Sequence, residues 1–246
     1  MPITIKVSNL NQGYGKNIVL HDINLSVKSG EILGLIGPSG AGKTRLVSTI
    51  MGMLTPKKGE VFVLGKKMPN RKILGKIGYM AQTDALYTTL TARENLNFFG
   101  SMQGISKTNL KKTIPQAAGI VNLNADLDKY VKDYSGGMKR RLSLAIALVS
   151  DPEILVLDEP TVGIDPELRQ QILQELHQEA KQGKTILLTT HVMEDAEQSD
   201  QLMMIRNGVA IAQGTPGQLI KDYHVNTVEE VFLKAGRLQD ENSSNH

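Results

Sequence analysis

Apolar and polar positions alternate in short runs near the N-terminus of the chain. These runs are rich in β-branched residues, are separated by glycine-bearing turns and lie at residues 3–7, 18–27 and 60–64. They predict an antiparallel β layer. A continuous apolar run at residues 32–36 leads into a glycine-rich turn and a helical stretch starting near Gly42, which predicts a strand, a loop and a helix in succession.

The pattern becomes helical between residues 84 and 150. Apolar residues recur at helical spacing within residues 91–102, 107–121 and 136–149. We therefore expect a helical subdomain inserted into the rest of the fold.

Two all-apolar runs follow, at residues 154–157 and 186–188, with a helical stretch at 167–181 between them. That helix is preceded by Asp165-Pro166, a capping residue followed by a first-turn proline. Apolar runs joined by helices are typical of buried parallel strands with crossover helices.

The C-terminal part of the chain contains a hairpin signal, Asn207-Gly208, between strand-like residues 202–205 and 209–212. Residues 239–246 are polar, and we expect this tail to fray. The predicted parts are a core with the antiparallel β layer at residues 1–83 and 151–223, a helical subdomain at residues 84–150 and a C-terminal extension with a polar tail at residues 224–246.

The composition narrows the functional classes. The chain has 246 residues, is 40% hydrophobic and carries a net charge of +3. It is long enough to bury a substantial core, and its charge is too small to indicate a nucleic-acid partner. The lack of cysteine excludes disulfides and thiolate metal sites within the chain. We find neither a signal peptide nor an apolar run near the roughly 20 residues that span a bilayer, so any membrane role is expected to be peripheral.

A glycine-rich segment after the apolar run at residues 32–36 matches a phosphate-binding loop. Its glycines allow consecutive backbone N–H groups to turn toward one anion, and the following helix N-terminus adds positive potential. Lys43 is expected to reach the β and γ phosphates of ATP, and the Thr44 hydroxyl to bind Mg²⁺. The alternative is a glycine-rich turn without a ligand. The segment consists of Gly37, Pro38, Ser39, Gly40, Ala41, Gly42, Lys43 and Thr44.

Two carboxylates, Asp158 and Glu159, end the apolar run at residues 154–157. Ligands of open α/β sheets bind at the carboxyl ends of strands. Asp158 is therefore expected to hold Mg²⁺, directly or through water, and Glu159 to polarise the attacking water. A solvated turn is the alternative for these two acids taken alone.

The segment Tyr134-Ser135-Gly136-Gly137-Met138 resembles the signature sequence of ABC ATPases. The resemblance implies an α/β fold with a P-loop NTPase core, a mainly parallel sheet and a helical signature subdomain. It also implies a head-to-tail dimer in which this segment faces the γ phosphate bound by the opposite subunit. Ser135 can offer a hydroxyl, and the N–H groups of Gly136 and Gly137 can point at an anion from an uncapped helix end.

This segment departs from the commonest signature at two positions. Tyr134 stands where leucine is usual, and Met138 stands where glutamine is usual. Met138 cannot form an amide hydrogen bond, so the resemblance implies only the backbone contacts and the Ser135 hydroxyl.

Four further residues match motifs of the same family. Gln82 resembles the glutamine that contacts Mg²⁺ and the attacking water, and His191 resembles the switch histidine at the γ phosphate. Asp165 resembles the loop that crosses the dimer interface, and Tyr14 the aromatic residue that stacks on adenine. Considered without the family motifs, each residue has an ordinary alternative. Gln82 would be a surface amide, His191 a buried imidazole, Asp165 only a helix cap and Tyr14 an aromatic residue in a turn.

The resemblance implies the ATP-binding and hydrolysing subunit of an ABC transporter, at the cytoplasmic face of a membrane beside a separate permease subunit and a second ATP-binding subunit. Alternatives are an importer subunit, or a soluble ABC ATPase that acts on ribosomes, DNA or iron–sulfur assembly. Ser135 follows Lys43 by only 92 positions (135 − 43), and the residues between them lack the sustained heptads of a coiled-coil insertion.

Residues 90–96, 191–197 and 227–233 resemble the ATP-binding subunits of bacterial multidrug and antibiotic exporters, so export of drugs, antibiotics or lipid-like compounds is the preferred direction. A coupling surface for the permease is expected beside Gln82. The alternative is that these side chains belong to the core of the helical subdomain. They are Leu86, Tyr87, Leu90 and Phe98.

Overall fold

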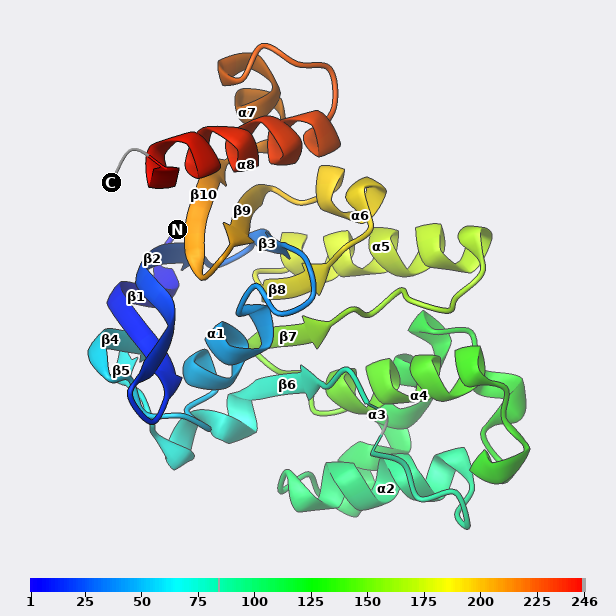
Figure 1. The fold of residues 1–246 in the computed structure, drawn as a ribbon. Helices are drawn as coiled ribbons and strands as arrows, with labels where there is room; N and C mark the ends of the chain where they lie inside the picture. Colours follow the sequence, from blue (N-terminus) through cyan, green and yellow to red (C-terminus); the bar gives the residue numbers. More distant parts are fainter. Residues whose placement is uncertain (84, 245–246) are drawn as a thin grey trace. The chain divides into compact units, whose positions relative to one another are not determined.

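The computed structural model describes residues 1–83 and 85–244 (Figure 1). The chain divides into two compact units, Met1–Ile73 with Leu187–His246, and Leu74–Ile186. The predicted boundary at residue 84 and the tail residues 245–246 lie outside the described residues. The limits of the predicted helical subdomain stay a prediction.

The antiparallel layer of the first unit consists of β1 (Ile3–Tyr14), β2 (Asn17–Lys28), β4 (Lys58–Val63) and β5 (Lys66–Lys67), in the order β2-β1-β4-β5. All its pairs are antiparallel. Alternate side chains of β1 and β2, such as Ile5 and Val27, are buried, as expected for a sheet with one face on a core. The predicted layer is confirmed, with longer strands than the sequence indicated.

The first unit also contains β3 (Ile32–Ile36), β9 (Gln201–Arg206) and β10 (Val209–Gly214). β3 is parallel to β9, while β9 and β10 form the predicted antiparallel hairpin. Helix α1 (Lys43–Ile50) follows β3 after the glycine-rich loop, and α6 (Met193–Glu197) packs against β3.

Two C-terminal helices complete the first unit, α7 (Pro216–Asp222) and α8 (Val228–Ser244). They pack against each other and against β10 (Figure 1). Leu219, Val228 and Val231 share a buried cluster with Leu202 and Met204 of β9. The first part of the predicted fraying tail is helical, because α8 continues to Ser244.

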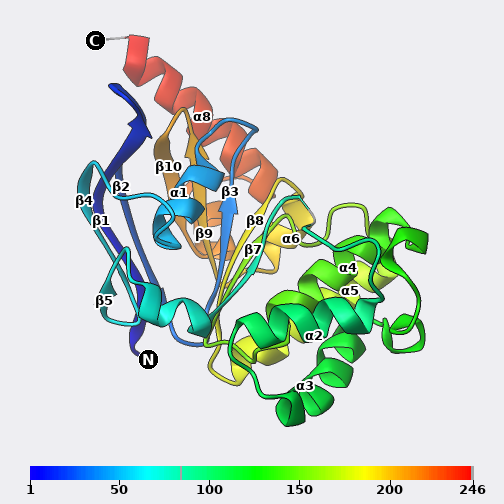
Figure 2. The same cartoon turned by 90° about the horizontal axis from the view of Figure 1, so that it is seen from below.

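The second unit contains a parallel strand pair, β6 (Ile77–Met80) with β7 (Ile154–Asp158). Its helices are α2 (Ala92–Met102), α3 (Lys107–Ile120), α4 (Gly136–Leu148) and α5 (Pro166–Lys181). Helices α2, α3 and α4 pack on one another (Figure 2). Helix α4 also packs on β6. Short 3₁₀ turns lie at Arg71–Lys76, Asn124–Asp126 and Val131–Asp133, and β8 (Thr185–Thr190) extends across the division at residue 186.

Side-chain caps explain why the predicted helices begin where they do. Thr91 and Glu94 form a reciprocal capping box at α2, and Ser106 accepts a hydrogen bond from the Asn109 N–H at α3. Asp165 accepts from the Leu168 N–H at 3.0 Å before Pro166. Within the described residues, no helix combines the length and the apolar character needed to cross a bilayer.

Candidate nucleotide-binding site

The glycine-rich loop between β3 and α1 requires glycine at two positions. At Gly42 the φ angle is 108°, in the left-handed region. A Cβ on Gly37 would lie 2.3 Å from the carbonyl oxygen of Ile205, and no side chain fits there. The loop therefore lies tightly against β9, with Pro38, Ser39 and Gly40 exposed at its tip.

Lys43 is held against this loop. Its Nζ donates hydrogen bonds to the carbonyl oxygens of Gly37 at 2.5 Å and of Pro38 at 3.1 Å, and the residue is 9% exposed. No acidic residue lies in the first turn of α1. The ammonium group and the α1 N-terminus thus form one positive region, which suits a polyphosphate.

Tyr14 lies at the end of β1 and is 71% exposed. The Arg45 guanidinium lies over its ring, 3.3 Å from the ring centroid, and also donates to the Gly13 carbonyl oxygen at 2.9 Å. Sequence reasoning missed Arg45, although it directly follows Thr44. The contact depends on the fold, because α1 brings residue 45 onto the turn between β1 and β2.

His191 follows β8 and is exposed. The preceding Thr190 accepts a hydrogen bond on its Oγ1 from the Val192 N–H at 2.9 Å, which fixes the turn that carries His191. The reading of His191 as a buried imidazole is therefore wrong.

In the second unit, Asp158 is the last residue of β7 and is 3% exposed. The next residue, Glu159, has a φ of 53°, a left-handed conformation that costs a non-glycine residue free energy. Burial raises the pKa of Tyr79 on the neighbouring strand β6, and the negative charge of Asp158 raises it further. The two carboxylates thus have different surroundings, because the first is buried and the second lies on a strained turn.

Arg140, on the buried side of α4, binds both the segment that ends at Gln82 and the segment that contains the two carboxylates. Its guanidinium donates to the carbonyl oxygens of Ala81 at 2.8 Å, Gln82 at 3.0 Å and Glu159 at 2.8 Å, and also to that of Asp158. It is 7% exposed. Sequence reasoning missed this residue. The available signal was an arginine on the otherwise apolar face of the helix that follows the signature.

The side chains of Gln82 and Asp165 are both exposed. Gln82 is anchored through its carbonyl by Arg140. Asp165 is the N-cap of α5. The structure confirms this capping, while a further role for Asp165 across a dimer interface stays a prediction.

The signature segment begins α4, and the expectation of an uncapped helix end is wrong. Ser135 Oγ accepts a hydrogen bond from the Met138 N–H at 3.2 Å. The N–H groups of Gly136 and Gly137 form no hydrogen bond with any described residue. These two donors stay available at an exposed helix N-terminus.

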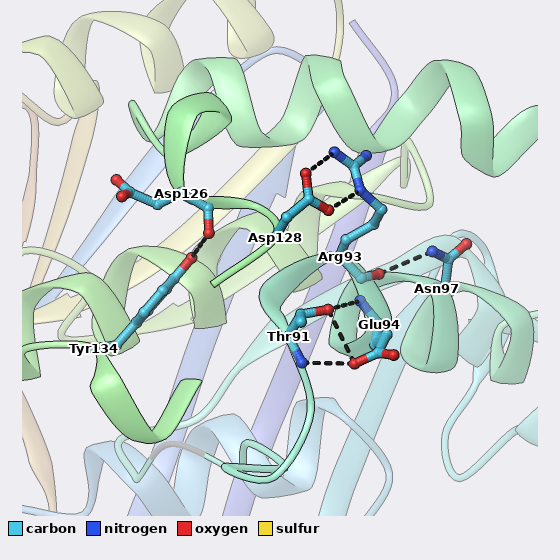
Figure 3. Close-up of polar contacts among 7 residues, drawn as sticks. All are labelled: Thr91, Arg93, Glu94, Asn97, Asp126, Asp128 and Tyr134. Atoms are coloured by element: carbon cyan, nitrogen blue, oxygen red, sulfur yellow. Dashed lines mark hydrogen bonds and ion pairs between the residues drawn. The ribbon is translucent and has the colours of Figure 1, made fainter. Parts of the chain in front are cut away.

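Tyr134 replaces the usual leucine of the signature and is 5% exposed. Its hydroxyl donates to the Asp126 carbonyl oxygen at 2.8 Å (Figure 3). Burial, reinforced by the charge of Asp126, raises the pKa of Tyr134 to about 12. The substitution therefore anchors the signature to the preceding turn, a contact that leucine cannot form.

The available oxygen donors fit a magnesium ion. No group of three or more His, Cys, Asp or Glu side chains converges as a metal site in the described part of the chain. Mg²⁺ is commonly held by one or two carboxylates, substrate phosphates and water. A buried carboxylate, Asp158, and a hydroxyl beside the phosphate loop, Thr44, match that donor chemistry.

This combination of fold and loop defines a nucleotide hydrolase of the P-loop class. Residues 20–162 match the ABC transporter family. The chain is 41% identical over 234 residues to the Nod factor export ATP-binding protein I of Rhizobium johnstonii, covering 94% of this chain and 75% of that protein. The chain belongs to the ABC transporter family, as an ATP-binding subunit that hydrolyses Mg-ATP.

Solved structures agree with this assignment. An ATP-binding subunit of an ABC transporter superposes with a TM-score of 0.87 at 26% identity, covering 95% of this chain and 99% of that chain. A dimeric ATP-binding cassette in a post-hydrolysis state, bound to ADP and phosphate, superposes with a TM-score of 0.78 at 26% identity, covering 86% and 98%. The predicted α/β class, with its antiparallel layer and mainly parallel strands, is confirmed.

Proposed function

We propose that this chain powers an ABC exporter by binding a separate membrane-spanning permease subunit at the cytoplasmic face of the membrane. The observation that carries this proposal is an exposed apolar surface formed by Tyr87, before α2, and by Phe98 and Met102 of α2. Tyr87 is 47% exposed, Phe98 39% and Met102 71%. For Tyr87 and Phe98, the alternative that they belong to the core is wrong.

This surface contains a shallow, open groove, and the neighbouring Tyr87 is held in place by Phe98 and Asn95. Leu90, Phe98 and Met102 line a groove of about 590 Å³. The rings of Tyr87 and Phe98 meet edge to face with centroids 4.9 Å apart. The buried Asn95 amide donates to the Tyr87 carbonyl oxygen at 3.0 Å and accepts from the Tyr87 N–H at 2.9 Å. A shallow apolar groove suits a helix from a partner.

Export is the direction supported by the relatives, since the protein of Rhizobium johnstonii is named for export of Nod factor. We propose a drug, an antibiotic or a lipid-like compound as the transported substrate. The permease subunit is expected to select the substrate, whereas this chain supplies the ATPase.

For the ATPase we propose that two copies of this chain, or this chain and a close relative, hold two ATP molecules in a head-to-tail dimer. Lys43 and the loop N–H groups bind phosphate, and Tyr14 stacks on adenine. Ser135 and the free N–H groups of Gly136 and Gly137 contact the γ phosphate on the opposite subunit. Asp165 contributes to the interface between the copies.

For hydrolysis we propose that Glu159 polarises the attacking water, while His191 and Gln82 orient the water and the γ phosphate. Bound Mg²⁺, held by Thr44, Asp158 and Gln82, would neutralise charge that develops on the phosphate oxygens. No covalent intermediate on the protein is required, because in-line attack by water depends on positioning and charge stabilisation.

The test uses membranes of the source cells that contain the permease and have been stripped of this chain. We expect Tyr87→Ala and Phe98→Ala each to lower membrane binding and permease-stimulated ATP turnover about 10- to 100-fold, since an apolar side chain buried in an interface contributes roughly 1.5–3 kcal/mol. Tyr130→Ala is the matched control, because Tyr130 is a 50% exposed tyrosine of the same unit. Full binding and full stimulated turnover by both groove variants would contradict the proposed coupling.

A further inference from the structure

A second cleft, of about 380 Å³, opens between α2 and α3. Basic side chains lie on its rim, and apolar side chains form its floor. Leu110 and Ile114 in the floor are almost fully buried, so the cleft has a firm base. The cleft is lined by the basic residues Arg93, Lys107 and Lys111 and by the apolar residues Leu110, Ile114 and Pro115.

The positive charges of this rim are unequal. Arg93 is neutralised by Asp128, to which it donates from Nε at 2.7 Å and from Nη2 at 3.0 Å (Figure 3). Hydrogen bonding within this pair raises the pKa of Arg93 and lowers that of Asp128. Lys107 and Lys111, one helical turn apart and exposed, form no ion pair with any residue that the structure describes. Two positive charges thus remain at the cleft mouth.

The cleft adjoins the apolar groove of Leu90, Phe98 and Met102, because Asn97 and Ser101 of α2 line both. Asn97 Nδ2 donates to the Arg93 carbonyl oxygen at 2.9 Å, which holds this side chain along the helix (Figure 3). The groove carries one acid, Glu94, whose carboxylate accepts from the Thr91 N–H at 2.8 Å. An apolar surface thus lies beside a cleft whose Lys107 and Lys111 form no ion pair with any described residue.

We infer that this cleft binds a carboxylate side chain on the permease segment that occupies the groove. The inference rests on the proposed function and specifies the chemistry of the partner, which is an apolar helix with an Asp or Glu placed to meet Lys107 and Lys111. Two lysines one turn apart on one rim can share a single carboxylate, and the neighbouring apolar floor lowers the local dielectric constant and strengthens the attraction. The charge pair would fix the register of the helix, while the groove supplies apolar contact.

The test measures binding of this chain to the permease in membranes stripped of the wild-type chain. We expect the double variant Lys107→Glu with Lys111→Glu to bind about tenfold or more weakly, since two favourable pairs become repulsive. Wild-type binding should weaken as salt rises, and binding of the double variant should not. The matched control is Lys112→Glu, an exposed lysine of the same helix outside both clefts. A permease variant with lysine in place of the partner carboxylate should restore binding of the double variant.

The outcomes separate the two proposals. If the wild-type chain does not bind these membranes, the proposed function fails, and the inference fails with it. If wild type binds and the double variant binds equally well, only the inference is overturned. Vesicles of phosphatidylcholine with about one third phosphatidylglycerol serve as a further probe. Equal loss of binding to these protein-free vesicles would show a lipid headgroup as the ligand and would also overturn the inference.

Discussion

Removal of Arg140 should destabilise the second unit. Its guanidinium donates to four backbone carbonyl oxygens, of Ala81, Gln82, Asp158 and Glu159. The bond to Asp158 is buried, and the others are partly buried. Arg140→Ala leaves one buried acceptor without its donor, at about 1–3 kcal/mol, and weakens three more that water can partly replace, at about 0.5–1 kcal/mol each. We therefore expect a loss of about 3–5 kcal/mol in the free energy of unfolding.

Thermal unfolding followed by circular dichroism measures this loss, which corresponds to a fall in Tm of about 10 °C for a chain of this size. The control is Arg141→Ala on the same helix, whose guanidinium donates to the carbonyl oxygens of Val121 at 3.2 Å and Asn122 at 2.8 Å. For this variant we expect a loss of about 1 kcal/mol. If both variants unfold at the same temperature, the reasoning on Arg140 is refuted. The milder Arg140→Lys should retain the fold and lose turnover more than ATP affinity, because one ammonium group cannot contact both loops.

Three further predictions concern other parts of the structure. The pKa of Tyr134 is raised from 10.0 to about 12, so the folded state favours the protonated form of this side chain. Its contribution to the free energy of unfolding is complete below pH 10 and is lost as pH rises from 10 to 12. Tyr134→Phe should remove this part of the pH dependence, as measured by urea unfolding. Mg-ATP at about 100 times its Kd should stabilise the wild-type chain by about 2.7 kcal/mol, whereas Lys43→Ala or removal of Mg²⁺ with EDTA should abolish most of the accompanying rise in Tm. Gly42→Ala should lose about 1–3 kcal/mol in the same assay, because its φ is 108° and its Cβ would lie 2.5 Å from Leu20 Cδ2; an unchanged Tm would contradict this.

Local sequence patterns predicted those features that depend on neighbouring residues. The glycine-rich loop, the start of α2 at Thr91 and the cap of α5 at Asp165 are encoded within a few positions, and the structure places them accordingly. The hairpin around Asn207-Gly208 is a similar case, since the turn residues alone determine it.

The features that sequence reasoning missed depend on contacts between distant residues. Arg140 and Glu159 are 19 positions apart, and Arg45 lies over Tyr14 only because the fold brings α1 to the β1–β2 turn. Strand β6 was missed for a different reason. Its four residues are too few to show the alternation of apolar and polar positions that indicates a strand. At Ser135, the resemblance to the family signature led us to expect an uncapped helix end that faces a ligand. The Ser135 side chain instead caps α4, a position at which serine is common.

The central claim is that Glu159 activates the attacking water in an ATP-bound dimer. The most direct measurement compares ATP turnover and oligomeric state of wild type and Glu159→Gln in Mg-ATP, with Glu153→Gln as control, since Glu153 pairs with Lys76 on the surface. We predict that Glu159→Gln retains ATP, loses turnover about 100-fold or more and accumulates as a dimer, while the control behaves as wild type. Undiminished turnover would remove Glu159 from the mechanism, and a monomer that retains ATP would contradict the two-site dimer.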